Sequence, residues 1–258
     1  MPSILFEINN FIAFITLNRP EKFNAFNREM ALLLQERLDE CEGDKDIRCV
    51  FITGSGKAFS AGQDLTEVVD PNGPGMKKTL SEHYNPIITK IRNLNKPVVA
   101  AVNGIAAGAG ANVALCCDVV IAAQSASFLQ AFSKIGLIPD SGGTFFLPRL
   151  IGFQKASAYM MLSDKISATE AEGFGMIYKI FPDISFKEEA EKIALTLASL
   201  PTIALAYTKQ ALNKSQAQSL DEQLKTEDDF QQKAALTNDF KEGVAAFLEK
   251  RKAIFKGE

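Results

Sequence analysis

The sequence predicts an α/β fold with mainly parallel strands. Three short apolar runs, at 49–53, 98–102 and 119–122, are typical of strands buried on both faces. Helical patterns separate these runs, and repeated strand-then-helix units join parallel strands by right-handed crossovers. After residue 150 the pattern becomes predominantly helical. We therefore expect a helix-covered sheet followed by a helical region.

The first elements follow from local patterns. Residues 3–9 and 11–17 are two β-rich runs separated by Asn10, which predicts a hairpin. Asn27 is placed to cap a helix, because the apolar residues after it recur at helical spacing. The next unit is a helix near 81–94 that leads to the strand at 98–102. A further helix, beginning at Ala111, leads to the strand at 119–122.

Two apolar stripes characterise the last third of the chain. One runs through 190–198 and the other through 240–248, and Pro201 marks a helix start between them. A helix with one apolar face must bury it against the core or against another subunit. We therefore divide the chain into a core at 1–195 and a helical oligomerisation region at 196–258.

Composition excludes several classes of function. The 258 residues are 47% apolar and 23% charged, as in globular proteins. A net charge of −3 gives no electrostatic basis for binding nucleic acid. Because no apolar run reaches the roughly 18 residues of a membrane span, no membrane association is expected. The first ten residues lack the features of a signal peptide, so a cytoplasmic location is expected.

The cysteine and histidine content argues against a metal site. Four cysteines, at 41, 49, 116 and 117, show no metal-ligand spacing. The adjacent pair Cys116–Cys117 is typical of core filling. His83 is the only histidine. We expect no metal.

The stretch from 100 to 144 has the strongest chemical signal. A strand-like run turns through Gly104, Gly108 and Gly110 into a helix, and Asp140 follows between Pro139 and Ser-Gly-Gly. Glycines allow close approach of a ligand to the backbone, and a helix start presents free N–H groups. These features fit an anion hole with a proton carrier. On spacing alone, a packed strand–turn–helix with Asp140 as an N-cap is favoured over that functional interpretation.

Several motifs, in one order along the chain, resemble the enoyl-CoA hydratase/isomerase (crotonase) superfamily. They are LNRPEKFNAF at 17–26, KAFSAGQDL at 57–65, VNGIAAGAGANVAL at 102–115, GLIPDSGGTFFLPRLIG at 136–152, EGFGMIYKI at 172–180 and FLEKRKAIF at 247–255. The resemblance implies a spiral of ββα turns with a C-terminal helical trimerisation region. It implies a homotrimer or dimer of trimers, an acyl-CoA substrate, and no cofactor beyond that coenzyme A.

The resemblance also implies a set of site residues. The backbone N–H groups of Gln63 and Ala109 would hold the thioester oxygen, where one such donor is typically worth about 3 kcal/mol of barrier. The coenzyme A would contact Lys22, Ala61, Gln63, Asp64, Leu65 and Thr66, and the acyl pocket would include Asn112, Phe132 and Ile138. Lys250 or Arg251 would reach the 3′-phosphate of coenzyme A in a neighbouring subunit.

Departures from the family pattern indicate which reaction is catalysed. Hydratases of this family carry glutamates at the positions of Asn112 and Phe132. Neither Asn nor Phe can move a proton, so we expect weak or absent hydratase activity. Asp140 is the remaining acid. Apolar neighbours disfavour its charged form and a following helix start favours it, so its protonation state stays open.

Asp140 could serve as a nucleophile or as a proton shuttle. A dehalogenase of the family uses this position as a nucleophile with the help of a tryptophan, and this chain has none. We therefore favour a shuttle. The segments NGIAAGAGA, EHYNPII and AFSKIGLIPDSGGT resemble the branch that converts 1,2-epoxyphenylacetyl-CoA to oxepin-CoA. The alternative is a Δ3,Δ2-enoyl-CoA isomerase of fatty-acid oxidation.

Two further classes are disfavoured. One relative in this family binds RNA through a lysine-rich helix, but the first helix here ends acidic. A dinucleotide-binding loop would need a third glycine where Val113 stands.

Overall fold

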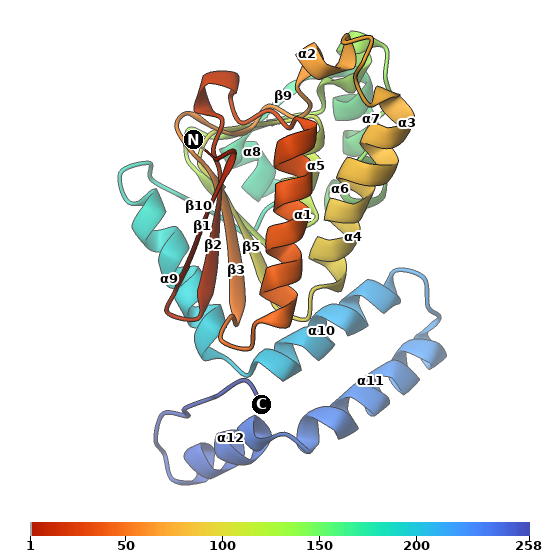
Figure 1. The fold of residues 1–258 in the computed structure, drawn as a ribbon. Helices are drawn as coiled ribbons and strands as arrows, with labels where there is room; N and C mark the ends of the chain where they lie inside the picture. The colour runs from red at the N-terminus through yellow and green to blue at the C-terminus, as the bar shows by residue number, and fades with distance from the viewer. Residues whose placement is uncertain (1) are drawn as a thin grey trace.

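A computed structural model describes residues 2–258 and contains two sheets with helices around them (Figure 1). The larger sheet has the strand order β1-β2-β3-β5-β7-β10. Its first two strands form the expected antiparallel hairpin, and every other pairing in it is parallel. The strands are β1 (Ile4–Asn9), β2 (Ile12–Leu17), β3 (Cys49–Gly54), β5 (Val98–Val102), β7 (Val119–Ala123) and β10 (Lys179–Phe181).

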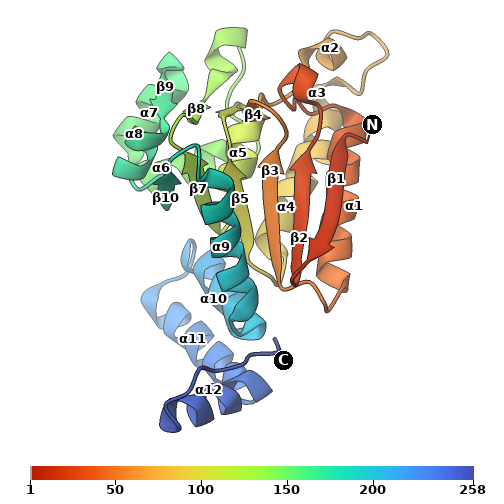
Figure 2. The ribbon, with the colours of Figure 1, turned by 90° about the vertical axis from the view of Figure 1, so that its left-hand side faces the viewer.

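Helices cover both faces of this sheet. Helices α1 (Arg28–Gly43) and α4 (Asn85–Asn93) lie on one face, and α9 (Phe186–Ser199) lies on the other (Figures 1 and 2). Every residue of β5 is buried as a result, which explains its uninterrupted apolar sequence. The predicted cap of α1 is confirmed, because the Asn27 side chain accepts a hydrogen bond of 3.0 Å from the Met30 N–H.

A smaller sheet of four strands carries the segments that later form the site. Its order is β4 (Ala58–Ser60), β6 (Ile105–Ala107), β8 (Ser127–Leu129) and β9 (Lys165–Ser167), with only β9 antiparallel to its neighbour. Strand β6 occupies part of the expected glycine turn, and α5 (Ala109–Leu115) begins two residues before the predicted Ala111. The chain bends at Gly104, between β5 and β6, and of the three glycines Gly108 alone has a positive φ (+52°). Gly110 lies inside α5, where an added Cβ would be 2.6 Å from the Ser60 carbonyl oxygen.

The remaining helices flank the smaller sheet or extend from the larger one. They are α2 (Leu65–Val68), α3 (Gly75–Lys78), α6 (Gly143–Ile151), α7 (Phe153–Leu162), α8 (Ala168–Gly173), α10 (Thr202–Ser215), α11 (Leu220–Ala235) and α12 (Asn238–Leu248). Helices α10–α12 project from the end of the molecule opposite to α2 (Figure 1).

The expected division at residue 195 falls inside α9, which continues to Ser199. The alanines of its apolar stripe, at 190, 194 and 198, are buried against the chain's own sheet. That stripe is therefore satisfied within one chain. Helix α9 ends at Ser199, and Pro201 precedes the first residue of α10, as predicted.

The described part of the chain contains no membrane-spanning helix, no metal-type cluster and no disulfide. Among residues 2–258, no helix is both long and apolar enough to cross a bilayer. Over the same residues, no three His, Cys, Asp or Glu side chains gather as a metal site requires. The four cysteines are buried free thiols.

Candidate active site

A cavity of about 480 Å³ lies where α2, the start of α5 and the 3₁₀ helix η3 (Ala131–Ile135) meet. It brings together three segments that are distant in sequence. Its lining is mostly apolar and includes one carboxylate. The lining residues are Ala61, Gln63, Leu65, Val68, Val69, Met76, Gly108, Ala109, Ala131, Phe132, Lys134, Ile135, Leu137 and Asp140.

Two backbone amides lie along this cavity. Ala109 is the first residue of α5, so its N–H has no partner one turn earlier in the helix. Gln63 follows Gly62 (φ +88°), and its N–H donates to no acceptor among residues 2–258. A Cβ at Gly62 would be 2.8 Å from the Ala107 carbonyl oxygen and 3.3 Å from the Ala109 nitrogen. Only glycine allows the two turns to pack this closely.

Asp140 is the only carboxylate that lines the cavity. Burial raises the pKa of Asp140 above its ordinary value, and a 2.8 Å hydrogen bond from the Ser141 hydroxyl opposes that rise. Of the influences on the Asp140 pKa, burial is therefore the largest. Asp140 is not an N-cap, because α6 is capped by Gly142 (φ +74°) without any side-chain hydrogen bond. The carboxylate remains available to a ligand.

Asn112 and Ile138, both predicted in the acyl pocket, do not line this cavity. Asn112 is fully buried and donates a 2.8 Å hydrogen bond to the Asp140 carbonyl oxygen. Ile138 is 81% exposed, because the chain runs over the surface after the left-handed turn at Gly136 (φ +72°). Phe132 does line the cavity, as predicted.

The predicted coenzyme A segment is divided between lining and supporting residues. Ala61, Gln63 and Leu65 line the cavity. The side chain of Asp64 instead pairs with Arg19 at 2.9 Å and accepts hydrogen bonds from the N–H and hydroxyl of Thr66, which caps α2. The side chains of Asp64 and Thr66 therefore stabilise the cavity wall from behind and do not line the cavity.

Lys22 lies beside the cavity, on the 3₁₀ helix η1 (Pro20–Lys22). Its side chain is exposed. The next residue, Phe23, accepts a 2.9 Å hydrogen bond at its carbonyl oxygen from the Ala61 N–H. This contact fixes η1 against the wall that Ala61 forms.

Lys250 and Arg251 lie just beyond α12, at the end of the molecule opposite to α2 (Figure 1). The Arg251 guanidinium pairs with Glu242 and Glu249 at 2.6 Å each. Within one chain, neither residue reaches the cavity. The predicted contact with a neighbour's coenzyme A stays a prediction.

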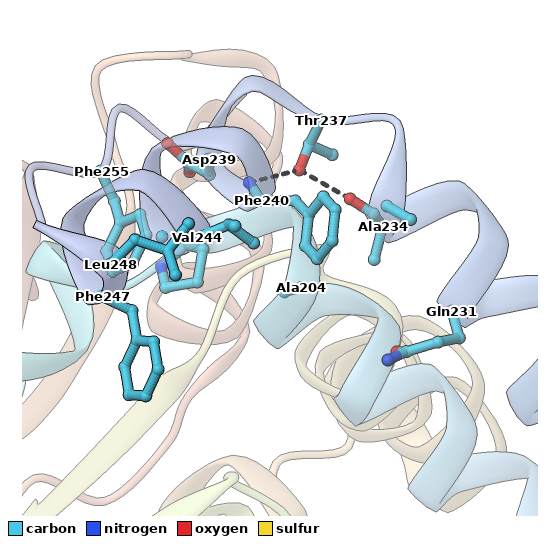
Figure 3. A pocket seen from close by; sticks show the side chains of 13 residues that line it. Ala204, Gln231, Ala234, Thr237, Asp239, Phe240, Val244, Phe247, Leu248 and Phe255 are labelled. Carbon is cyan, nitrogen blue, oxygen red and sulfur yellow. Dashed lines mark hydrogen bonds between the residues drawn. The ribbon is translucent and has the colours of Figure 1, made fainter.

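A second cavity, of about 450 Å³, lies between α10, α11 and α12 (Figure 3). Its walls are largely apolar and carry no feature of a catalytic site. Phe240, Val244, Phe247 and Leu248 of α12 contribute to it and are also exposed. The Thr237 hydroxyl accepts from the Phe240 N–H at 3.1 Å and donates to the Ala234 carbonyl oxygen at 2.7 Å, which fixes the start of α12.

Sequence reasoning missed several lining residues. Val68, Val69 and Met76 lie on short helices or in the loop between them, where no periodic signal exists. Lys134 and Leu137 belong to the motif AFSKIGLIPDSGGT, but the predicted acyl pocket did not include them. Lys134 and Ile135 line the cavity consecutively and Leu137 follows the left-handed turn at Gly136, so no helical or strand periodicity marks them.

Comparisons with known proteins agree with this geometry. The family model described as "Enoyl-CoA hydratase/isomerase" matches residues 7–258. The chain is 45% identical to "1,2-epoxyphenylacetyl-CoA isomerase" of Escherichia coli over 261 residues, covering 100% of both proteins. It is 34% identical to "Trans-2-decenoyl-[acyl-carrier-protein] isomerase" of Streptococcus mutans, covering 99% of this chain and 98% of that protein. The crystal structure of an enoyl-CoA hydratase from Bacillus anthracis matches with a TM-score of 0.91 and 34% identity, over 99% of this chain and 100% of that one.

Proposed function

Because the chain belongs to the enoyl-CoA hydratase/isomerase (crotonase) family, we propose that it is an isomerase of acyl-CoA thioesters. One observation carries the proposal. The two free amides of Gln63 and Ala109 share a cavity with a single carboxylate, Asp140, whose pKa is raised by burial. This is the donor and proton-carrier arrangement that enolate chemistry needs.

Each step of the proposed isomerisation is assigned to a residue of the cavity. The thioester oxygen accepts hydrogen bonds from the Gln63 and Ala109 N–H groups. Asp140 takes a proton from the carbon next to the thioester, and the electron pair moves onto that oxygen as an enolate. The protonated Asp140 then returns the proton to a carbon further along the acyl group. No atom is gained or lost, so the product is an isomer.

The residues that line the cavity support isomerisation better than hydration. Adding water requires one group to activate the water and another to protonate carbon. Asn112 is buried with its amide engaged, and Phe132 has no proton to exchange. Asp140 alone supports a one-carboxylate isomerisation.

For the acyl group, we propose 1,2-epoxyphenylacetyl-CoA, which is converted to oxepin-CoA. The ring C–C bond bridged by the epoxide oxygen breaks and its electron pair enters the ring double bonds, which gives the seven-membered ring, and the shuttle moves one proton. The 45% identity to an isomerase of that name supports this substrate, and the mostly apolar wall with Phe132 suits a flat ring. The alternative is a Δ3,Δ2-enoyl-CoA isomerase, supported by the similarity to a decenoyl isomerase. Both need the same proton shuttle.

The coenzyme A moiety would lie along Ala61, Gln63 and Leu65, with Lys22 at the edge. Asp64 and Thr66 would take part through their main chains, because their side chains bind each other. No cofactor beyond coenzyme A enters the proposal. If Lys250 or Arg251 meets the 3′-phosphate in a neighbouring subunit, replacing both by alanine raises KM for every acyl-CoA, and an unchanged KM refutes the contact.

We propose that copies of the chain assemble as a homotrimer or a dimer of trimers. The exposed apolar face of α12 supports this assembly. In that face Phe247 is 83% exposed and Leu248 is 74% exposed, although both are large apolar side chains. A second copy is the occupant that would cover it.

Mass spectrometry and NMR of the products from a panel of coenzyme A thioesters test the activity. The panel contains 1,2-epoxyphenylacetyl-CoA, 3-hexenoyl-CoA and crotonyl-CoA. An isomer of unchanged mass from either of the first two is expected, with the faster substrate identifying the acyl specificity. A product heavier by one water from crotonyl-CoA as the main activity would overturn the proposal.

A further inference from the structure

The hydroxyl of Tyr84 is a buried donor without a partner. Tyr84 is 1% exposed, and its oxygen has no hydrogen-bond partner among residues 2–258. It is the last residue of the π-helix η2 (Thr79–Tyr84), which leads directly into α4. Buried polar groups are almost always paired, and π-helical turns occur frequently at functional sites. The proton shuttle proposed above does not use this hydroxyl.

Tyr84 packs behind the cavity wall, and its neighbours contact both the Gln63 segment and the Asp140 loop. Its ring packs edge-on against Phe26, with centroids 6.0 Å apart, and Phe26 pairs through its backbone with Gln63. One turn further along, the Ile88 side chain lies 3.7 Å from where a Cβ on Gly142 would be, so this helix packs against the loop of Asp140. Tyr84 is therefore linked through Phe26 to the segment of Gln63, and through its own helix to the loop of Asp140.

The charges around Tyr84 are consistent with this position. Burial raises the pKa of Tyr84 well above its ordinary value, and the carboxylates of Asp140, Glu67 and Asp64 raise it further. A phenol in this environment stays neutral at any working pH. It can donate a hydrogen bond but cannot act as a base or a nucleophile.

We propose that the Tyr84 hydroxyl donates a hydrogen bond to an oxygen carried by the acyl group, and that this contact selects oxygen-bearing acyl chains over purely hydrocarbon ones. The inference rests on the proposed isomerase function and deepens it. An acyl group with an epoxide oxygen satisfies the donor, whereas a hydrocarbon chain leaves it unpaired. Sites built to pair a polar group discriminate more strongly than apolar pockets do.

Tyr84 does not itself line the cavity and its oxygen is enclosed, so contact with an acyl group requires part of the cavity wall to move; α2 is the wall segment that we propose moves. This wall is a four-residue helix whose Leu65 and Val68 side chains line the cavity and are exposed. Glu67, between them, holds the wall by accepting a 2.9 Å hydrogen bond from the Arg28 N–H. An entering acyl group would have to displace the side chains of Leu65 and Val68, which are exposed and therefore weakly packed.

Kinetics of Tyr84→Phe with two substrates test the proposal. We expect kcat/KM for 1,2-epoxyphenylacetyl-CoA to fall at least tenfold, while that for 3-hexenoyl-CoA changes less than twofold. The melting temperature should not fall, because the variant removes an unpaired buried hydroxyl. Tyr207→Phe is the matched control, since Tyr207 stacks on Phe230 between α10 and α11, away from the cavity. Equal losses on both substrates, or no loss on either, would overturn the proposal.

A binding experiment separates this proposal from the isomerase function. Calorimetry compares (2-hydroxyphenyl)acetyl-CoA with phenylacetyl-CoA, which lacks the ring oxygen, on wild type and Tyr84→Phe. The wild type should prefer the hydroxylated thioester at least fivefold, and the variant should lose that preference. Without a preference in the wild type, the contact does not exist, whatever reaction the enzyme catalyses. Asp140→Asn, which abolishes turnover of both substrates if Asp140 is the shuttle, tests the isomerase function separately.

Discussion

The side-chain amide of Asn112 donates a hydrogen bond of 2.8 Å to the main-chain carbonyl oxygen of Asp140. The Asn112 oxygen in turn accepts a 2.8 Å hydrogen bond from the Gln130 amide, so both ends of the side chain are engaged. The loop packs closely here, because a Cβ on Gly143 would be 2.5 Å from the Asn112 amide nitrogen. Asn112 thus positions the backbone of the single carboxylate that lines the cavity.

Replacing Asn112 by alanine should reduce both stability and turnover. The change leaves the buried Gln130 amide without its partner and removes one of the two hydrogen bonds that the Asp140 carbonyl oxygen accepts, the other coming from the Gly143 N–H at 2.8 Å. The cost should be about 1–3 kcal/mol in free energy of unfolding. Because the loop of Asp140 loses its hydrogen bond to the Asn112 side chain, the carboxylate is positioned less accurately, and kcat should fall at least tenfold. Denaturant unfolding and steady-state kinetics measure the two effects.

Asn213→Ala is the matched control for this variant. Asn213 makes comparable hydrogen bonds to Arg92, between α10 and α4, far from the cavity. It should lose stability but keep its kcat. If Asn112→Ala keeps kcat as well, Asn112 does not position Asp140 for catalysis.

Asp140→Asn should lower turnover at least a hundredfold while the fold and coenzyme A binding are retained. Asparagine preserves the size of the side chain and can still accept the Ser141 hydrogen bond, but it cannot carry a proton. Near-normal turnover in this variant would remove Asp140 from the mechanism.

Thermal unfolding of Asp140→Asn provides the control for folding. The folded-state pKa of Asp140 is raised by burial, so its charged form costs stability as pH rises above the unfolded pKa. The variant should therefore melt at the same or a higher temperature at pH 7. Its advantage should shrink toward pH 3, where the carboxyl is protonated in both states.

The pH dependence of kcat/KM should report the Asp140 carboxylate. The base must be ionised, so the rate falls as pH falls through the raised pKa of Asp140. The hydrogen bond from the Ser141 hydroxyl opposes the rise. Ser141→Ala should therefore raise the pKa further and move the acidic limb to higher pH. A limb that stays in place or moves to lower pH contradicts the assignment.

Much of the fold could be predicted because its signals are local. The hairpin around Asn10, the Asn27 cap and the buried strand β5 each follow from alternation, capping chemistry or an unbroken apolar run. The resemblance to the family placed Gln63, Ala109 and Asp140 at one site, and the structure brings these three residues to one cavity.

What could not be predicted depends on contacts between distant segments. The sequence alone does not indicate that Asn112 would face the Asp140 backbone, or that Ile138 would turn outward while Leu137 turns inward. The apolar stripe at 190–198 predicted burial against the core or against another subunit, and the alanines of the stripe are covered by the sheet of the same chain. Periodicity identifies an apolar face, and only the tertiary structure identifies what covers it.

Crotonyl-CoA should be hydrated poorly. The prediction follows from Asn112 and Phe132, which stand where hydration would need two acids, and from the engagement of both ends of Asn112 within the protein. Hydration is measured as the loss of absorbance of the conjugated thioester. Isomerase activity measured in the same preparation is the control that the enzyme is active. Hydration at a kcat in the ordinary enzyme range of about 1–1,000 per second would contradict it.

The apolar face of α12 should mediate assembly. Phe240, Val244, Phe247 and Leu248 recur at helical spacing, so they form one face, and each of them is exposed in the single chain. Light scattering at micromolar concentration should give three or six times the mass of one chain. Phe247→Glu with Leu248→Glu places charges in the proposed interface and should lower that mass toward one chain. Ile184→Glu is the matched control, because Ile184 is a 99% exposed apolar residue in the loop before α9. A wild-type protein that is monomeric at this concentration, or a double variant that keeps its mass, would refute assembly through this face.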